Sequence, residues 1–149
     1  MALPKLLIKA IPKPFAAIAF LVLMLLAIML FLGRRTELFR SEALLAVAPA
    51  FYTHVSNFSI SYLLAAGIGY GWLMLGVRIA ALLWLALAVA LANIVYESFI
   101  PILNTPDPMD AWFGLAGTAL AALVLWAIAR HGLVANPGLA VPGARSDDP

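Results

Sequence analysis

The sequence predicts an all-α fold, a bundle of four transmembrane helices, from its composition and from the length of its apolar runs. The 149 residues are 65% hydrophobic and 11% charged, with a mean hydropathy of +1.05. Soluble domains are about 45–50% apolar and about 25% charged, and a soluble chain of this length has too little interior to bury the excess. Four apolar runs, each near the roughly 20 residues that cross a bilayer, lie at about 15–32, 57–76, 79–96 and 111–129. We therefore expect an integral membrane protein.

The segment before the first span, residues 1–14, places Lys5, Lys9 and Lys13 at four-residue spacing among leucines and isoleucines. In a helix, this spacing gives a basic amphipathic segment that lies on an anionic membrane surface. The following apolar run has a competing interpretation as the core of a cleaved signal peptide. It is longer than such cores usually are, and no small-x-small cleavage pattern follows it. We therefore expect a retained first span.

The connection between the first two spans contains a second, shorter apolar run, residues 43–52, which is interrupted by Pro49. Ten residues are too few to cross a membrane. We expect a short interfacial helix here, with Thr36 or Ser41 as its N-cap. The second and third spans are separated by so few residues that they must form an antiparallel hairpin.

A single transmembrane domain, residues 1–131, accounts for all four spans, and the tail 132–149 is predicted to be disordered. Four spans place both termini on one side of the membrane. Segments on that side hold six basic residues: Lys5, Lys9, Lys13, Arg78, Arg130 and Arg145. Segments on the other side hold three: Arg34, Arg35 and Arg40. The excess of Lys and Arg predicts cytoplasmic termini.

This topology brings polar residues from all four spans to the outer face of the membrane. The candidate polar site consists of Glu97, Asp110, His54, Asp107, Asn57, Asn93, Arg34 and Arg35. Helical spacing supports convergence, because His54 and Asn57 are three residues apart and Asn93 and Glu97 are four apart. Ionisable residues at a membrane are costly and often functional.

Structural roles explain the same residues one by one. Asp107 suits a turn, Asp110 suits a helix N-cap, His54 also suits a cap, and Glu97 suits a structural ion pair with an arginine. Both interpretations of the outer polar residues stay open.

Several functional classes have little support in the sequence. No basic cluster interleaves with aromatic residues, so we expect no nucleic-acid partner. The chain has no cysteine, and a single outer histidine with carboxylates is a poor zinc set. We predict no metal and no cofactor. No phosphate-binding glycine loop, metalloprotease motif or nucleophile elbow occurs, so whether the protein catalyses a reaction stays open.

Small residues at helical spacing indicate close helix packing. Gly67 and Gly71 are four residues apart in the second span, and Gly114, Gly117 and Ala121 form a stripe in the fourth. Within lipid, such residues let helices approach closely, although glycine is also common in membrane helices in general. These faces suit either packing within the bundle or docking to other membrane proteins.

Three stretches resemble the VanZ-like family of small bacterial membrane proteins. They are Thr53-His-Val-Ser-Asn-Phe-Ser-Ile-Ser-Tyr62, Tyr96-Glu-Ser-Phe-Ile-Pro101 and Asp107-Pro-Met-Asp-Ala-Trp-Phe-Gly-Leu-Ala-Gly117. His54 resembles the family histidine, Asp107 and Asp110 resemble its two aspartates, and Gly117 resembles its glycine. Asn104 or a neighbouring residue stands near the position of the family's arginine, and Gly114 replaces an asparagine. The resemblance covers roughly residues 50–121.

The resemblance implies a role in the bacterial cell envelope, at the plasma membrane, because the family is associated with low-level resistance to glycopeptide antibiotics such as teicoplanin. We expect an outward-facing site that binds or processes an amphiphile, either a lipid-linked precursor or a lipoglycopeptide. Glu97 and Asp110 would act as acceptors or acid–base groups, His54 as a proton carrier, and Arg34 or Arg35 as an anion contact. The alternative is a non-enzymatic subunit of a larger membrane assembly. A transporter has less support, because no span carries a charge near its midpoint and no internal repeat is evident.

Overall fold

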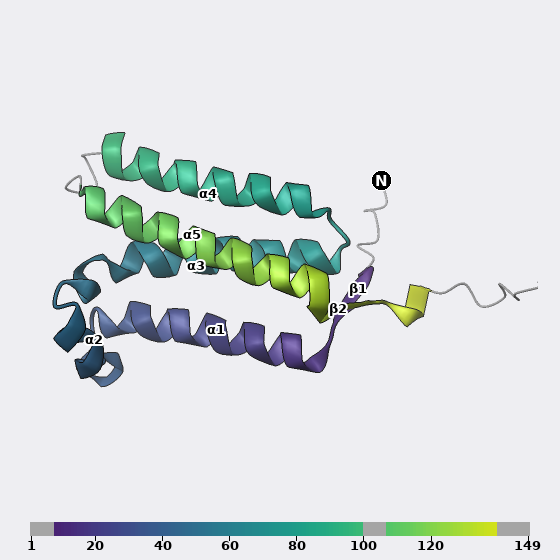
Figure 1. Cartoon of the computed structure of the whole chain (residues 1–149), viewed down its shortest axis with the longest axis horizontal. Coiled ribbons are helices and arrows are strands. Elements are labelled where there is room, and N and C mark those ends of the chain that lie inside the picture. The colour runs from purple at the N-terminus through teal and green to yellow at the C-terminus, as the bar shows by residue number, and fades with distance from the viewer. Residues whose placement is uncertain (1–7, 100–106, 140–149) are drawn as a thin grey trace, which may run out of the picture.

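The computed structural model describes residues 8–99 and 107–139, and these form an up-and-down bundle of four long helices (Figure 1). The helices are α1 (Pro14–Gly33), α3 (Phe51–Met74), α4 (Ile79–Phe99) and α5 (Pro108–Ala127). Each covers most of one predicted span. The largest difference is at α3, which begins at Phe51 rather than near residue 57. Of the polar residues at its start, His54, Ser56 and Asn57 are buried or half-buried, whereas Thr53 is exposed.

Three helices of the described chain are long and apolar enough to cross a membrane. They are Pro14–Gly33, Ile79–Glu97 and Pro108–Gly132. Helix α3 is not among them, because hydroxyl, imidazole and amide side chains lower the hydropathy of its first half. It packs most extensively against α5 and also contacts α1 and α4. Its 24 residues give a length of about 36 Å, so length alone does not set it apart from the other three.

The core of the bundle combines alanines with larger apolar residues, and a second buried cluster is formed by Leu73, Leu82, Leu125 and Ile128. Tyr62, Ala65 and Ala66 on α3 are buried with Ala27 on α1 and Ala121 on α5. By contrast, α1 and α4 leave many large apolar side chains exposed. This distribution suits a bundle whose outer surface meets lipid, because apolar side chains that face lipid are not exposed to water.

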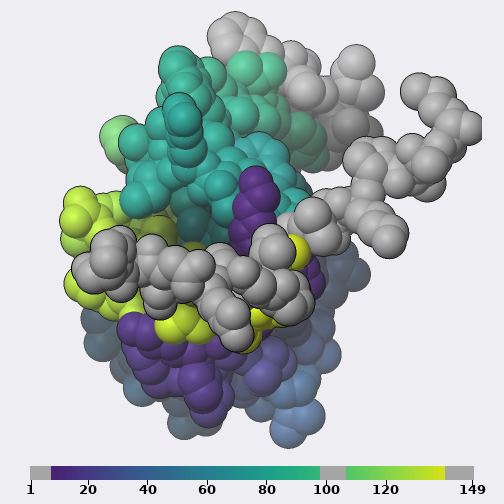
Figure 2. Space-filling model, turned by 90° about the vertical axis from the view of Figure 1, so that its right-hand side faces the viewer, coloured from purple at the N-terminus to yellow at the C-terminus, as the bar shows by residue number. Residues whose placement is uncertain are grey.

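The two ends of the described chain meet in a short two-stranded sheet at one end of the bundle. Strand β1 (Ala10–Pro12) pairs antiparallel with β2 (Leu133–Ala135), with Ile11 opposite Val134. Figure 2 looks onto this end, where purple amino-terminal and yellow carboxy-terminal residues lie side by side. The backbone N–H of Lys9 donates to Met74 and that of Lys13 donates to Gly132, which ties β1 to the ends of α3 and α5.

This sheet corrects two predictions. Residues 10–12 are a strand rather than part of an amphipathic helix, because their backbone groups are paired by β2. The chain after residue 131 does not become disordered at once, because a π-helical turn (Ile128–Gly132), β2 and a 3₁₀ turn (Pro137–Leu139) follow α5. The remaining parts of both predictions, residues 1–7 and 140–149, lie outside the described residues.

The connection from α1 to α3 contains the short helix that the sequence predicts, preceded by a 3₁₀ turn (Glu37–Phe39). Helix α2 spans Glu42–Val47, and the Ser41 hydroxyl accepts a hydrogen bond from the backbone N–H of Leu44 at 3.4 Å. Ser41 is therefore the N-cap of α2. The hydroxyl of Thr36 instead donates to the carbonyl of Leu32 at 3.0 Å. That α2 lies at a membrane surface stays a prediction.

Candidate functional site

The candidate site lies at the end of the bundle opposite the β1–β2 sheet. Because the chain reverses direction at each connection, the end of α1, the start of α3, the end of α4 and the start of α5 meet there (Figure 1). All the carboxylates of the described residues are at this end: Glu37, Glu42, Glu97, Asp107 and Asp110. The two ends of the bundle therefore differ in chemistry, since the other end carries Lys9, Lys13, Arg78 and Arg130.

A histidine–carboxylate pair joins α3 to α5. The Nδ1 atom of His54 lies 2.8 Å from Oδ1 of Asp110 and 3.6 Å from Oδ2 of Asp107. The side chains of His54 and Asp110 are 13% and 18% exposed. The ring centroids of Phe113 and His54 are 5.5 Å apart. The pair is thus sheltered but still partly accessible, so a proton-exchanging group of a ligand could come within hydrogen-bond reach of it.

The two aspartates have different structural roles. Asp107 is the N-cap of α5, and its Oδ1 accepts from the backbone N–H of Met109 at 2.9 Å. Asp110 lies in the first turn of the helix rather than at the cap, so the interpretation of Asp110 as the N-cap is wrong. A carboxylate in the first turn is stabilised by the helix dipole, and its side chain remains available to His54.

The same three side chains have the donor types of a cation site. One ligand atom each from His54, Asp107 and Asp110 can be chosen so that all three lie within 4.8 Å of one another. The hydrogen bond between His54 and Asp110 and the cap made by Asp107 already account for this arrangement. The absence of a metal stays a prediction.

A second cross-link joins α3 to α4. The side-chain amide of Asn57 donates to Oε1 of Glu97 at 2.8 Å, and Glu97 is only 3% exposed. A buried carboxylate is stable only where hydrogen-bond donors or cations surround it. The sequence suggested an arginine partner for Glu97, whereas the described partner is the amide of Asn57.

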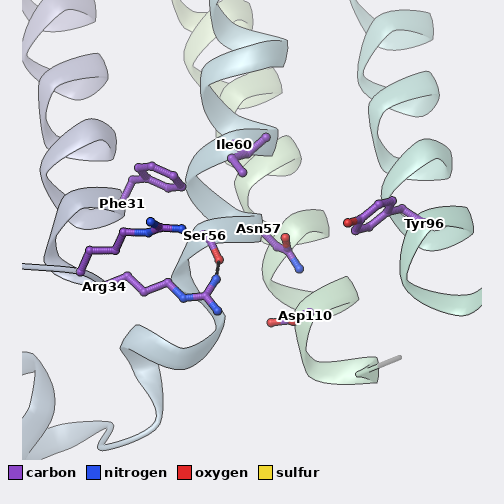
Figure 3. Close-up of a pocket in the computed structure, with 8 residues that line it drawn as sticks. Phe31, Arg34, Ser56, Asn57, Ile60, Tyr96 and Asp110 are labelled. Carbon is purple, nitrogen blue, oxygen red and sulfur yellow. Dashed lines mark hydrogen bonds between the residues drawn. The ribbon is translucent and has the colours of Figure 1, made fainter. Parts of the chain in front are cut away.

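The two arginines at the end of α1 face this cluster from the other side. A guanidinium nitrogen of Arg34 donates to the hydroxyl of Ser56 on α3 (Figure 3). Among the described residues, neither Arg34 nor Arg35 forms an ion pair with a carboxylate. Their positive charge is therefore not neutralised by a direct contact with an acidic side chain of that part of the chain.

Part of this cluster lines a pocket of about 260 Å³, to which all four long helices contribute. Its lining residues are Phe31, Arg34, Arg35, Ser56, Asn57, Ile60, Tyr96 and Asp110. In Figure 3, Arg34 and Asp110 lie on different helices, with Ser56 and Asn57 between them and Tyr96 on the far side. We call this cavity the polar pocket.

An apolar groove of about 560 Å³ adjoins the polar pocket. The two share Asn57, Ile60 and Tyr96 as lining residues. The groove otherwise runs between α3 and α4, and most of its lining is aliphatic: Leu64, Ile68, Leu85, Ala88, Val89 and Ala92, together with Ser61 and Asn93. We call it the α3–α4 groove. A polar cavity therefore lies directly beside an apolar one.

Asn93 and the predicted packing glycines are placed apart from the polar pocket. Asn93 lines the groove, and its amide occupies the space that a side chain at position 114 would need. Gly117 is packed against the backbone of Phe58, so Gly114 and Gly117 serve contacts within the bundle. A Cβ atom added at Gly67 would meet only the Met24 side chain, and one added at Gly71 would meet nothing within 4 Å.

The structure thus brings six of the eight candidate residues together around two hydrogen-bonded pairs and one pocket, with Asp107 and Asn93 at its margins. Sequence reasoning missed Ser56 and did not place Tyr96 at the site. Their role depends on contacts between helices, and Ser56 is 22 residues from its partner Arg34. The polar character of residues 53–61 was the available signal.

Three comparisons with known proteins found no match to this chain. The chain matches no family model, and neither a curated protein nor a solved structure is significantly similar to it.

Proposed function

We propose that this chain is a four-span membrane protein that binds an amphiphilic component of the cell envelope at the membrane interface. The observation that carries the proposal is the junction of the polar pocket with the α3–α4 groove. An amphiphile has the same two-part chemistry, a polar head joined to an apolar chain. The two cavities, at about 260 and 560 Å³, together have the size of common small-molecule sites, about 300–1,000 Å³.

The polar pocket suits a head group with negative charge. Arg34 and Arg35 line one side of it without a described acidic partner. Guanidinium groups bind phosphate and carboxylate with two parallel hydrogen bonds. The apolar chain of the ligand would then lie along the aliphatic lining of the groove, where burial contributes about 0.8 kcal/mol per methylene relative to water.

The fourth span of this proposal is α3. Three helices are apolar enough to cross a membrane, and α3 lies among them with its polar side chains facing protein. Enclosed polar groups do not meet lipid, so a helix of this composition is compatible with a membrane interior. With four spans, the excess of Lys and Arg near the two termini supports cytoplasmic termini and an outward-facing polar pocket.

The resemblance to VanZ-like proteins supports an envelope ligand, either a lipid-linked precursor or a lipoglycopeptide antibiotic. The bundle end that carries His54, Asp107 and Asp110 is also the end that carries the pocket. If the bound amphiphile is processed, the His54–Asp110 pair is the group that we assign to proton transfer. Binding is the function that the geometry supports best.

A test of the binding function is to fill the groove without disturbing the polar pocket. Ala92 lines the groove, whereas its neighbour Leu91 does not and is 51% exposed. We expect Ala92→Trp to remove the lipid-mass adduct seen by native mass spectrometry of the gently extracted protein, and Leu91→Trp to retain it. Equal adduct occupancy in both variants would contradict the proposal.

One observation favours the alternative of a subunit in a larger membrane assembly. A Cβ atom added at Gly71 would meet nothing within 4 Å, and one added at Gly67 would meet only the end of the Met24 side chain at 3.9 Å. A helix face with such small residues and no internal partner suits docking of another membrane helix. Co-purification of a partner that Gly71→Leu abolishes, and that Asp110→Asn does not affect, would support this role.

A further inference from the structure

The polar pocket has two chemically different sides. Arg34 and Arg35, at the end of α1, supply hydrogen-bond donors with positive charge. Asp110, at the start of α5, supplies a carboxylate on another helix (Figure 3). A ligand with negative charge alone would satisfy the arginines but would place that charge in the same pocket as Asp110. The charges that line the pocket therefore do not match a ligand that carries negative charge alone.

The Asp110 side retains hydrogen-bonding capacity for a ligand. Oδ1 of Asp110 is engaged by His54, while Oδ2 accepts no hydrogen bond from the described residues. The amide nitrogen of Asn57 is directed to Glu97, which leaves its carbonyl oxygen as a second acceptor at the pocket. Acceptors on this side call for a donor on the ligand.

Resting on the proposed function, we infer that the head group pairs an anionic phosphate with a hydrogen-bond donor a few atoms away. The phosphate lies between Arg34 and Arg35, and the donor, an ammonium or a hydroxyl group, lies against Asp110. Phosphoethanolamine and phosphoglycerol head groups share this chemistry. Phosphocholine does not, because its quaternary nitrogen carries no N–H, and a bare phosphate monoester lacks the second group.

Competition between lipids that differ only in the head group tests this specificity. The full chain in detergent is mixed with equal amounts of dioleoyl phosphatidylethanolamine, phosphatidylglycerol, phosphatidylcholine and phosphatidic acid, and adducts are counted by native mass spectrometry. One charge-assisted hydrogen bond corresponds to about a tenfold preference, so we expect the ethanolamine or glycerol adduct to exceed the choline adduct by about tenfold. Which of these two is favoured identifies the donor as ammonium or hydroxyl.

Two outcomes separate this inference from the proposed function. If all four lipids bind equally through the groove, or if phosphatidic acid binds most tightly, the donor requirement is wrong while amphiphile binding stands. If no lipid adduct forms that Ala92→Trp removes, the proposed function itself is wrong. Both results come from the wild-type chain and the groove variant, so neither depends on the folding of a pocket variant.

Paired carboxylate variants then test the assigned residue. Asp110→Asn keeps the shape of the side chain but removes its charge, and we expect the preference over phosphatidylcholine to fall by about tenfold. Asp107→Asn is the matched control, because Asp107 also approaches His54 but does not line the pocket, and asparagine serves equally well as an N-cap. An unchanged preference in Asp110→Asn, or an equal loss in Asp107→Asn, would contradict the role of Asp110.

Discussion

Gly117 on α5 lies close to the backbone of Phe58 on α3, and its replacement by alanine should destabilise the bundle. A Cβ atom at position 117 would overlap the carbonyl oxygen of Phe58 and lie 2.9 Å from its carbonyl carbon. Carbon atoms pack at about 3.5–4.0 Å, so the two helices must separate by roughly 0.5 Å or more. The obstacle is backbone, which cannot rotate away as a side chain can.

The expected cost follows from the extent of that contact. Overpacking of a close-packed core costs about 1–3 kcal/mol, and the interface of α3 with α5 is the most extensive in the bundle. We expect the free energy of unfolding to fall by about 2–3 kcal/mol in Gly117→Ala. Gly71→Ala adds the same methyl group where nothing lies within 4 Å, so it should be neutral or stabilise the helix by up to about 1 kcal/mol.

Unfolding by sodium dodecyl sulfate from mild detergent micelles, followed by tryptophan fluorescence and circular dichroism, measures both variants. The chain has four tryptophans, which supply the optical signal. The decisive quantity is the difference between the two alanine variants, since both make the same chemical change in a long helix of the bundle. A Gly117→Ala protein as stable as the wild type would refute the close approach of α3 and α5.

Two further predictions concern the buried carboxylate and the topology. Asn57→Leu removes a hydrogen-bond donor from Glu97 and should lower the free energy of unfolding by about 1.5–3 kcal/mol in the same assay. Asn57→Gln keeps an amide and should recover part of that loss. A leucine variant as stable as the wild type would mean that the amide does not stabilise Glu97. Because the chain lacks cysteine, single cysteines introduced at Thr36, Met109 and His131 report on which side of the membrane each position lies. An impermeant thiol reagent added to intact cells should label the first two positions but not the third. Labelling of all three from outside would contradict the four-span topology.

Much of the bundle could be predicted because the signals are local. The length and hydropathy of an apolar run depend on neighbouring residues alone, and they located α1, α4 and α5 to within a few residues. The short helix α2 followed from its length and its capping serine. The predicted start of α3 was too late, because the residues from Thr53 to Asn57 are mostly polar and therefore resemble the boundary of an apolar span. They instead form the first turns of α3, where Ser56 is buried and His54 and Asn57 are half-buried.

The candidate site was predictable as a neighbourhood but not as a set of contacts. Alternating helix directions bring His54, Glu97 and Asp110 to one end of the bundle, and that step needs only topology. The pairing of His54 with Asp110 and of Asn57 with Glu97 depends on the rotation of each helix about its axis. Low amphipathic contrast in such apolar helices leaves that rotation undetermined by sequence pattern.

Composition alone predicted a membrane protein, since apolar surface accumulates residue by residue whatever the fold, and three helices are long and apolar enough to cross a membrane. Tertiary structure decided the rest. It paired Ala10–Pro12 with Leu133–Ala135 across nearly the whole chain, joined Arg34 to Ser56, and placed a polar pocket against an apolar groove. Each of these is a contact between segments far apart in sequence, and its energy depends on close packing in three dimensions, which no local pattern of residues encodes.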